Sequence, residues 1–528
     1  IVVEGSGKLT LTDSNTAAEH KFMPGTNGLW VLDEENGKET VTGGVITGGT
    51  GKPIQFGSGE YVYYAYYGGG VYIAPGGQLT MTGGNIIGCS ATDGGGVCAD
   101  PLTNQTSQFS MSGGSIAGCV ATDIGGGVRA SGTFKMSGKA VIRSCTAESA
   151  TQFVCGGGVY VDGSSSFEMS NEAKIEGCQA ISTSSNSSNG GGVYVSSSSS
   201  FVMSDAAKIE NCQAISNSSK SSKGGGVHLS NNTKFTLSGS AVIQNCTATN
   251  SVNSGEAYGG GVSAACMRWI TLEGNAQISQ CAAVNGSGLY ITGSKNNSGY
   301  GELYAIGGSV DGDVVLGDPT DTTVGPGTIT GTGGTVFNGK VTVTTDSVIE
   351  SGTFNGEVIN NGTITGGVFN STVSGSGTIT GGTFNTPITG SGTESDPYQI
   401  STADQLKLFR DIVNGAGGQT PNRGAWAVLT ADIDLNNEAW TPIGPDRDSA
   451  YTGTFDGQGH TVRNLSVTGN FNRAGLFGCV KDGTIRKLTV AGSVSCTANQ
   501  GWCGGIAGYA NDETIENCAS LCTVSCTG

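Results

Sequence analysis

Charged side chains are scarce in this chain, and most of those present are acidic. Only 13% of the 528 residues are charged, with 25 Lys and Arg against 42 Asp and Glu and a formal net charge of −17. Such a chain offers no basic face to a phosphate backbone, so we expect no nucleic-acid partner. Histidine is also rare, since His20, His228 and His460 are the three present. A multi-histidine metal site or a Ser/His/Asp triad is therefore disfavoured.

Long apolar runs are absent as well. No apolar run reaches the roughly 18 residues that a membrane-spanning helix needs, so we expect no membrane span in this fragment. The chain starts at Ile1 without the charged leader and cleavage site of a signal peptide, and residues 523–528 stop inside what looks like a repeat. We therefore expect the sequence to be part of a longer protein whose export signal or anchor lies elsewhere.

Glycine, by contrast, is abundant, and much of it lies in a repeat. A glycine triplet followed by Val recurs eight times, counting a degenerate last copy, and the copies begin at residues 68, 94, 125, 156, 190, 224, 259 and 286. Each of the first seven triplets is followed by a segment such as Phe167-Glu-Met169, and then by an Ile three residues before a Cys, as in Ile175 and Cys178. Length varies between the Cys and the next triplet. These connections are rich in Ser and Asn, which predicts flexible loops.

The repeat predicts stacked short strands. Three β-type segments per repeat are too short for crossover helices and too regular for hairpins. Side chains alternate along a strand, so Val159 and Val161 point to one side and Tyr160 to the other. We therefore predict an all-β fold, a right-handed parallel β-helix (solenoid), with Val, Phe, Met, Ile and Cys in its interior.

Two repeat copies carry a family resemblance most clearly, LTMTGGNIIGCSA at 79–91 and FSMSGGSIAGCVA at 109–121. They resemble the glycine-rich repeats of large secreted or wall-attached β-helix proteins of Gram-positive gut bacteria, and more distantly those of polymorphic outer membrane proteins. Asn commonly stands in those repeats where this chain has its Cys, and Ser170 and Ser204 replace the Asn of the FxxN motif. The resemblance implies an extracellular location at a bacterial cell surface.

We expect four regions. Residues 1–67 are interpreted as irregular leading coils, and 68–300 as the main β-helix with its eight repeats. In 301–392 the period shortens, which we interpret as a thinner solenoid with two strands per coil. Residues 393–528 resemble the GLUG-repeat modules of bacterial surface proteins and are interpreted as a truncated β module. The shorter period is marked by Phe337, Phe354, Phe369 and Phe384.

One short helix is predicted near 402–414, in the GLUG-like module. Thr402 and Gln405 have the spacing of a capping box. Leu406, Phe409 and Val413 then share one helix face, and Gly415 closes the helix.

Cysteine is plentiful but lacks the spacing of a metal site. Seven cysteines occupy equivalent repeat positions without a CxxC motif or a His partner, so we expect free thiols that form a buried core ladder rather than a zinc site. Cys98 and Cys155 lie outside this ladder, and one or two disulfides are expected in the last module. The ladder consists of Cys89, Cys119, Cys145, Cys178, Cys212, Cys246 and Cys281.

The outward positions of the first strand form a second column, which is rich in tyrosine. Tyrosine combines an apolar ring with a polar tip, so this column is our candidate surface for stacking sugar rings. The alternative interpretation is β-propensity on an exposed sheet. The candidate ligand-binding residues are Tyr72, Arg129, Tyr160, Tyr194, His228 and Tyr290.

Carboxylates supply a third set of candidates. Parallel β-helix enzymes that cleave polysaccharides need clustered carboxylates, and Glu168, Glu172, Glu176, Asp205 and Glu210 are candidates, although Lys174 and Lys208 are placed to pair with them. A calcium ion near Asp311 and Asp313, with Asp318 and Asp321, is the one cofactor considered, because Asp-rich turns supply its oxygen ligands.

Three functions remain open from the sequence. The first is a monomeric, non-enzymatic adhesin or stalk that binds surface glycans or host or bacterial proteins. The second is a carbohydrate-active β-helix enzyme, either a polysaccharide lyase or a glycoside hydrolase. The third is a purely structural surface spacer without a ligand.

Overall fold

The computed structural model describes residues 1–13, 17–25, 28–56, 63–99, 106–150, 152–183, 186–265, 268–294, 301–318, 324–384, 388–416, 419–499 and 501–526. It confirms the predicted all-β parallel solenoid, which has about 14 turns. The chain divides into two compact units, Ile1–Thr383 and Phe384–Gly528. No helix among the described residues has the length and apolar character needed to cross a membrane.

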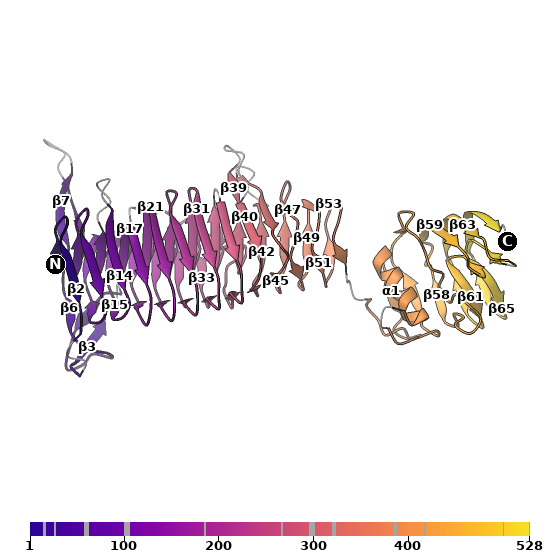
Figure 1. The fold of residues 1–528 in the computed structure, drawn as a ribbon, viewed down its shortest axis with the longest axis horizontal. Coiled ribbons are helices and arrows are strands. Elements are labelled where there is room, and N and C mark those ends of the chain that lie inside the picture. Colours follow the sequence, from indigo (N-terminus) through magenta and orange to yellow (C-terminus); the bar gives the residue numbers. More distant parts are fainter. Residues whose placement is uncertain are drawn as a thin grey trace. The chain divides into compact units, whose positions relative to one another are not determined.

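Three ladders of parallel strands run through the first unit (Figure 1). The first contains the strand after each glycine triplet: β1 (Val2–Val3), β9 (Val71–Ile73), β13 (Val97–Ala99), β17 (Val128–Met136), β21 (Val159–Met169), β25 (Val193–Val195), β30 (Val227–Ser230), β35 (Val262–Ala265), β38 (Leu289–Ile291), β42 (Val314–Leu316), β46 (Val341–Val343), β49 (Val358–Asn360) and β52 (Val373–Ser374).

The second ladder contains the Phe-x-Met segments and shares the long strands β17 and β21 with the first. Its other members are β2 (Lys8–Leu11), β10 (Gln78–Met81), β14 (Ser107–Met111), β26 (Ser200–Met203), β31 (Thr233–Leu237), β36 (Arg268–Leu272), β40 (Gly301–Ala305), β44 (Gly327–Thr330), β47 (Val348–Ile349), β50 (Thr363–Ile364) and β53 (Thr378–Ile379).

The third ladder contains the Ile segments and forms a sheet of 13 strands. Its members are β6 (Val45–Thr47), β11 (Asn85–Ile87), β15 (Ser115–Ala117), β18 (Val141–Arg143), β22 (Lys174–Glu176), β27 (Lys208–Glu210), β32 (Val242–Gln244), β37 (Gln277–Ser279), β41 (Ser309–Val310), β45 (Val336–Phe337), β48 (Thr353–Phe354), β51 (Val368–Phe369) and β54 (Thr383–Phe384).

A further sheet lies in the connections between each Cys and the next triplet. It contains β12 (Ser90–Asp93), β16 (Val120–Ile124), β19 (Thr146–Ser149), β23 (Gln179–Ser182), β28 (Gln213–Ser216) and β33 (Thr247–Asn250). Its second part consists of two-residue strands that directly precede the triplets. We call these the return strands: β20 (Val154–Cys155), β24 (Ser188–Asn189), β29 (Ser222–Lys223) and β34 (Ala257–Tyr258), which follows a short 3-10 helix, η1 (Ser254–Glu256).

The Ser-rich connections are therefore more ordered than predicted. Ser182 and Ser216 are fully buried, and their hydroxyls donate to the backbone carbonyls of Asn186 (2.6 Å) and Lys220 (2.7 Å). Where the sequence predicted flexible loops, these serine side chains hydrogen-bond the backbone carbonyls of the turn.

The glycine triplet is required by close packing at the corner before the first ladder. In the copy at 190–192, Gly190 has a φ of +65°, which favours glycine. A Cβ on Gly191 would lie 2.3 Å from the backbone of Gln213, and one on Gly192 would lie 2.7 Å from the carbonyl oxygen of Gly226. Successive coils thus approach each other too closely at this corner for any larger residue.

The interior is a set of like-on-like stacks. The rings of Phe134, Phe167 and Phe201 lie with centroids 4.7 Å apart and planes within 5° of parallel. The register places each Phe on the next, as in Phe167 and Phe201. Since these rings are fully buried, the stacks stabilise the coil-to-coil contact along the solenoid.

The short-period region has three strands per coil, so the prediction of two is wrong. One coil contains β46, β47 and β48, and the next contains β49, β50 and β51. Compared with residues 68–300, the described coils of this region lack the further sheet that lies there between each Cys and the next glycine triplet. On the surface of this region the side-chain amides of Asn338, Asn355 and Asn370 form a ladder with 2.8 Å hydrogen bonds.

Besides its solenoid strands, the leading region contains two groups of antiparallel strands. Strands β3 (Glu19–Pro24), β4 (Trp30–Leu32) and β5 (Glu39–Thr42) form one small sheet. Strands β7 (Lys52–Phe56) and β8 (Tyr63–Tyr67) form the other, which continues into the sheet of β12.

The second unit contains helix α1 (Ala403–Asn414), as predicted. The Thr402 side chain accepts from the backbone N–H of Gln405, and Gly415 ends the helix with a φ of +69°. The described residues of this unit form four parallel sheets. The largest contains β55 (Tyr398–Ile400), β56 (Ala427–Leu429), β58 (Thr454–Asp456), β62 (Thr484–Arg486) and β66 (Thr514–Glu516), and the second contains β57 (Ile433–Asp434), β59 (Thr461–Gly469), β63 (Thr489–Cys496) and β67 (Ala519–Cys526). The other two sheets have two strands each, β60 (Arg473–Ala474) with β64 (Trp502–Cys503), and β61 (Phe477–Lys481) with β65 (Ala507–Asn511).

Candidate functional site

The outward residues of the first ladder lie in one column. Arg129 pairs with Tyr160, Tyr160 with Tyr194, and Tyr194 with His228 in the parallel register. The rings of Tyr160 and Tyr194 stack with centroids 5.1 Å apart and planes 3° from parallel. The His228 ring follows at 5.4 Å.

This stacking changes what the column can offer a ligand. Because Tyr160 and Tyr194 cover each other's faces, a sugar ring has no free face to stack on between them. The column instead presents ring edges and hydroxyl tips. It therefore suits hydrogen bonding to sugar hydroxyls better than the ring stacking expected from the sequence.

Much of the column is also covered, so the expectation of an exposed sheet is wrong there. Tyr67 packs against Tyr72, and Tyr258 packs against Tyr290. Both covering residues come from strands that end just before a glycine triplet, namely β8 and β34. The buried members of the column are Tyr72 (3% exposed), His228 (4%) and Tyr290 (3%).

Tyr160, Tyr194 and the more deeply buried His228 form the floor of a groove, which we call the column groove. Its volume is about 660 Å³, within the range of ordinary ligand sites. Return strands form one wall and the turns after the first ladder form the other. The lining includes Phe153, Tyr160, Asn189, Tyr194, Ser196, Lys223, His228, Ser230 and Asn231.

The floor of the column groove is uncharged, although Lys223 and Asp123 also line the groove. Burial raises the pKa of Tyr194 to about 12 and that of Tyr160 above its usual range. Burial, together with the charge on Lys223, lowers the pKa of His228 to about 3, so its imidazole is neutral at pH 7. Among the described residues nothing hydrogen-bonds to the buried His228 Nδ1. Hydroxyls, amides and a neutral imidazole are groups that bind polyols.

Phe153 adds an apolar element to this groove. Its side chain lines the groove and is 63% exposed, unlike the mutually covered tyrosines. A largely free aromatic ring beside a row of hydrogen-bonding tips provides both contacts that a sugar ring uses.

A second, acidic groove of about 580 Å³ adjoins the first and shares Asp123 and Gln152 with it. Asp93, Glu148, Tyr64 and Tyr67 also line it. Neither Asp93 nor Asp123 was predicted as a site residue from the sequence. Asp93 stands directly before a glycine triplet, where later copies have Ile124, Cys155, Asn189 and Lys223, and this variation along the repeat was the available signal. Asp123 stands one residue further from its triplet.

Arg129 stands between the two grooves. Its guanidinium forms ion pairs with Asp93 and, at 3.4 Å, with Asp162. It also lies 5.7 Å from the ring centroid of Tyr67 and 5.9 Å from that of Tyr160. Arg129 is thus a positioning residue that holds two carboxylates and two aromatic rings together.

The carboxyl of Asp123 makes stability depend on pH. Burial, followed by the charge of Asp93, raises its pKa to about 6, above the usual value near 3.9. The folded protein then binds this proton more tightly than the unfolded chain, so the destabilisation is absent below about pH 4 and complete above about pH 6. We expect Asp123→Asn to raise the free energy of unfolding by about 1–2 kcal/mol at pH 7.5, and by much less at pH 4, in urea titrations. Equal effects at both pH values contradict this assignment.

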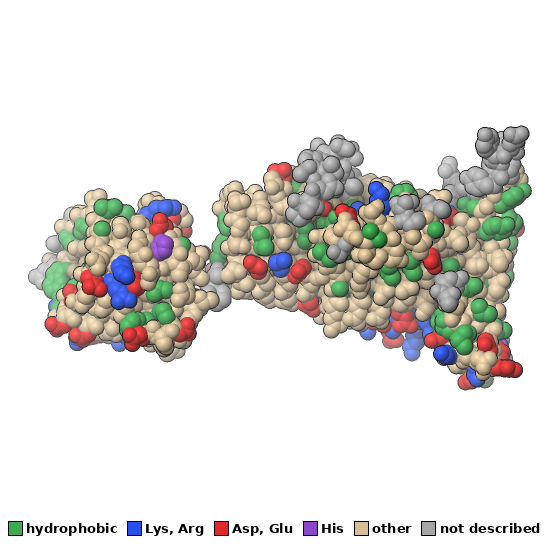
Figure 2. All heavy atoms as spheres, turned by 180° about the vertical axis from the view of Figure 1, so that it is seen from behind, with side chains coloured by type: hydrophobic (Ala, Val, Ile, Leu, Met, Phe, Trp, Pro, Cys, Tyr) green, Lys and Arg blue, Asp and Glu red, His purple; other side chains and the backbone are tan. Residues whose placement is uncertain are grey.

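The carboxylates named from the sequence do not line either groove. Glu168 pairs with Lys135 at 2.8 Å, and Lys174 pairs with both Glu176 (3.2 Å) and Glu210 (2.9 Å). Asp205 accepts from the backbone N–H of Asn171. These are paired surface groups, in keeping with the sparse charge on the face of the first unit that Figure 2 shows.

The three described aspartates among those considered for calcium each have a protein partner. Asp311 accepts from the Asn338 amide (2.7 Å), Asp313 from the Lys340 N–H (2.9 Å) and Asp318 from the Tyr290 hydroxyl (2.5 Å). Asp321 lies outside the described residues. Among the residues described, these carboxylates do not converge as a set of three metal ligands.

The seven cysteines of the predicted ladder are buried in the first unit as unpaired thiols. Burial raises the pKa of Cys119, which keeps its thiol protonated. Each thiol donates to a nearby carbonyl, as Cys178 does to Glu176 (3.5 Å). These thiols pack as small apolar groups.

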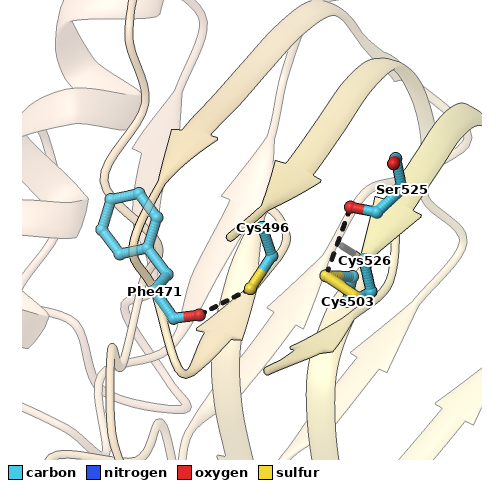
Figure 3. Close-up of a disulfide and its surroundings, with 5 residues drawn as sticks. All are labelled: Phe471, Cys496, Cys503, Ser525 and Cys526. Atoms are coloured by element: carbon cyan, nitrogen blue, oxygen red, sulfur yellow. Dashed lines mark hydrogen bonds between the residues drawn. A yellow bond between two sulfur atoms is a disulfide. The ribbon is translucent and has the colours of Figure 1, made fainter. Parts of the chain in front are cut away.

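The second unit holds one disulfide among the described residues, Cys503–Cys526, which ties two neighbouring coils together (Figure 3). Cys496 lies beside it, and its thiol donates to the Phe471 carbonyl (2.7 Å). The three sulfur atoms lie within 4.8 Å of one another.

The thiol state can be read by alkylation. In denaturant without a reductant, we expect the seven ladder cysteines to be alkylated, whereas Cys503 and Cys526 react only after reduction. Peptide mass spectrometry measures both. Protection of any ladder cysteine before reduction contradicts the free-thiol ladder.

No protein-family model matches this chain, and no solved structure matches it. The fold and grooves define its class as a parallel β-solenoid with a ligand-sized groove on its side. Halomucin of Haloquadratum walsbyi (strain DSM 16790 / HBSQ001) is 33% identical over 140 residues, which cover 24% of this chain and 1% of that protein. The chain thus spans about one hundredth of the length of the curated relative that it matches.

Proposed function

We propose that this chain is a non-enzymatic adhesin or stalk of a bacterial cell surface that binds glycans in the column groove. The observation that carries the proposal is the neutral, polar floor formed by Tyr160, Tyr194 and His228 beside the exposed ring of Phe153. Sugar recognition needs such hydrogen-bonding tips next to an apolar ring.

Two further points support display at a surface. The repeats resemble those of bacterial surface β-helix proteins and GLUG modules, and a part of the chain is similar to halomucin. The solenoid itself suits a stalk, because coils add length without changing the side groove.

A polysaccharide and mucin-glycan array, with reducing-sugar release measured on each bound glycan, tests this function. We expect binding to neutral glycans without release of sugar. Absence of any binding favours a structural spacer and overturns the proposal.

A carbohydrate-active enzyme is the second candidate, and one observation favours it. Asp93 and Asp123 line the acidic groove beside Arg129, and the raised pKa of Asp123 is near that of a general acid working close to neutral pH. Release of sugar that Asp123→Asn abolishes would establish this alternative.

A further inference from the structure

Two arginines and two aromatic rings form a compact cluster on the second unit. The Trp502 and Tyr509 rings stack with centroids 4.7 Å apart. The Arg447 guanidinium lies 5.6 Å from the Trp502 centroid and 4.7 Å from that of Tyr509. The Arg473 guanidinium lies 5.6 and 5.4 Å from the same two centroids. We call these four residues the arginine–aromatic cluster.

The chain brings the four residues together through the solenoid register. Trp502 in β64 pairs directly with Arg473 in β60, one coil earlier. Tyr509 lies in β65 of the same coil as Trp502, and Arg447 lies in the connection before β58. The Cys503–Cys526 disulfide holds β64 next to its neighbour strand, which fixes the position of Trp502.

Neither arginine of this cluster forms an ion pair among the described residues, although Asp446 and Asp448 flank Arg447 in the chain. Other arginines of this unit, such as Arg463 with Asp434 at 3.0 Å, have such partners. The neighbouring Asp446 accepts from Ser449. The buried Arg473 Nε has no hydrogen-bond partner among these residues. Two like charges above the same rings repel each other, and a bound anion removes that repulsion.

The cluster is accessible to a ligand. Trp502 is 44% exposed, and Arg447 is exposed as well. Guanidinium groups bind sulfate and carboxylate oxygens through paired N–H donors, and an exposed indole contacts the apolar face of a sugar ring. In a protein with a net charge of −17, two arginines without an ion pair among the described residues, beside an exposed indole, distinguish this site.

We propose that the arginine–aromatic cluster binds acidic saccharides, with Arg447 and Arg473 holding a sulfate or carboxylate group and Trp502 contacting the sugar ring. This site lies in the second unit and does not depend on the column groove. It takes a different class of glycan, since the floor of the column groove is neutral.

The test uses the full chain and titration calorimetry with a heparin-derived hexasaccharide, its desulfated form, maltohexaose and sodium sulfate. We expect the sulfated hexasaccharide to bind, maltohexaose not to bind at this site, and Arg447→Gln/Arg473→Gln to weaken hexasaccharide affinity at least tenfold. Binding of the desulfated form that the same double variant weakens assigns the carboxylates to the site. Trp502→Ala is expected to weaken binding severalfold.

Arg463→Gln is the matched control, because Arg463 is an exposed arginine of the same unit whose charge is already paired. Unchanged circular dichroism and melting temperature of the double variant show that it is folded. The proposal is overturned if the hexasaccharide does not bind, if the control loses as much affinity as the double variant, or if sodium sulfate binds as tightly as the hexasaccharide. Loss of binding in Tyr160→Phe/Tyr194→Phe instead would place acidic saccharides in the column groove and also overturn it.

Discussion

Replacing Phe201 by alanine is expected to lower the free energy of unfolding by about 3–5 kcal/mol. The ring is fully buried and stacks on Phe167 at 4.7 Å and on Phe235 at 5.0 Å, so its removal breaks two coil-to-coil contacts and leaves a cavity. Urea unfolding followed by circular dichroism measures the loss.

Val202→Ala is the control for this prediction. Val202 is the next residue of β26, but it faces outward and is 37% exposed. Its truncation should cost less than about 1 kcal/mol. A loss under 1 kcal/mol for Phe201→Ala, or equal losses for the two variants, contradicts the stacked interior.

The double variant Tyr160→Phe/Tyr194→Phe is expected to weaken glycan binding about tenfold or more while leaving stability nearly unchanged. Phenylalanine keeps the stacked rings and removes only the two hydroxyls, and each hydrogen bond to a sugar is worth about 0.5–1.5 kcal/mol. Calorimetry with a glycan identified on the array measures the change.

Tyr66→Phe is the matched control, because this tyrosine is 44% exposed but does not line the column groove. If the double variant binds as tightly as the wild type, the tyrosine hydroxyls take no part in recognition. Phe153→Ala then distinguishes the two remaining cases. Weaker binding indicates an apolar contact with Phe153, and unchanged binding indicates that the glycan does not bind in the column groove.

The repeat made the ladders predictable. Like residues recur at a fixed spacing, so the alternation in Val159-Tyr160-Val161 determines which side chains face inward, and the register places Tyr160 on Tyr194. The helix could be predicted for a similar reason, since Thr402 and Gly415 mark its two ends.

The cover over the column could not be predicted. The return strands have two residues each, too few for an alternating pattern, and they lie in the connections that vary most between repeats. Strands of two residues also explain why the third strand per coil after residue 301 was not predicted. Without the return strands the sequence shows an open tyrosine face, whereas the structure buries Tyr290 under β34 and leaves a groove at Tyr160 and Tyr194. Tyr72 is buried by the longer strand β8 of the leading region.

The acidic groove and the arginine–aromatic cluster were missed for another reason. Asp93, Asp123 and Arg129 depart from the repeat consensus. In the second unit, Trp502 and Tyr509 share one coil, whereas Arg447 and Arg473 come from earlier parts of the chain. A single sequence shows such residues as irregularities, and only the register of the coils brings them together.

The central claim, that a glycan binds in the column groove, is tested most directly by X-ray diffraction from crystals of the chain soaked with an oligosaccharide that binds on the array. The account predicts sugar density in the groove, with sugar hydroxyls within about 3.2 Å of the Tyr160 and Tyr194 hydroxyls and a ring against Phe153. Density at another site, with the column groove filled by water alone, would contradict it.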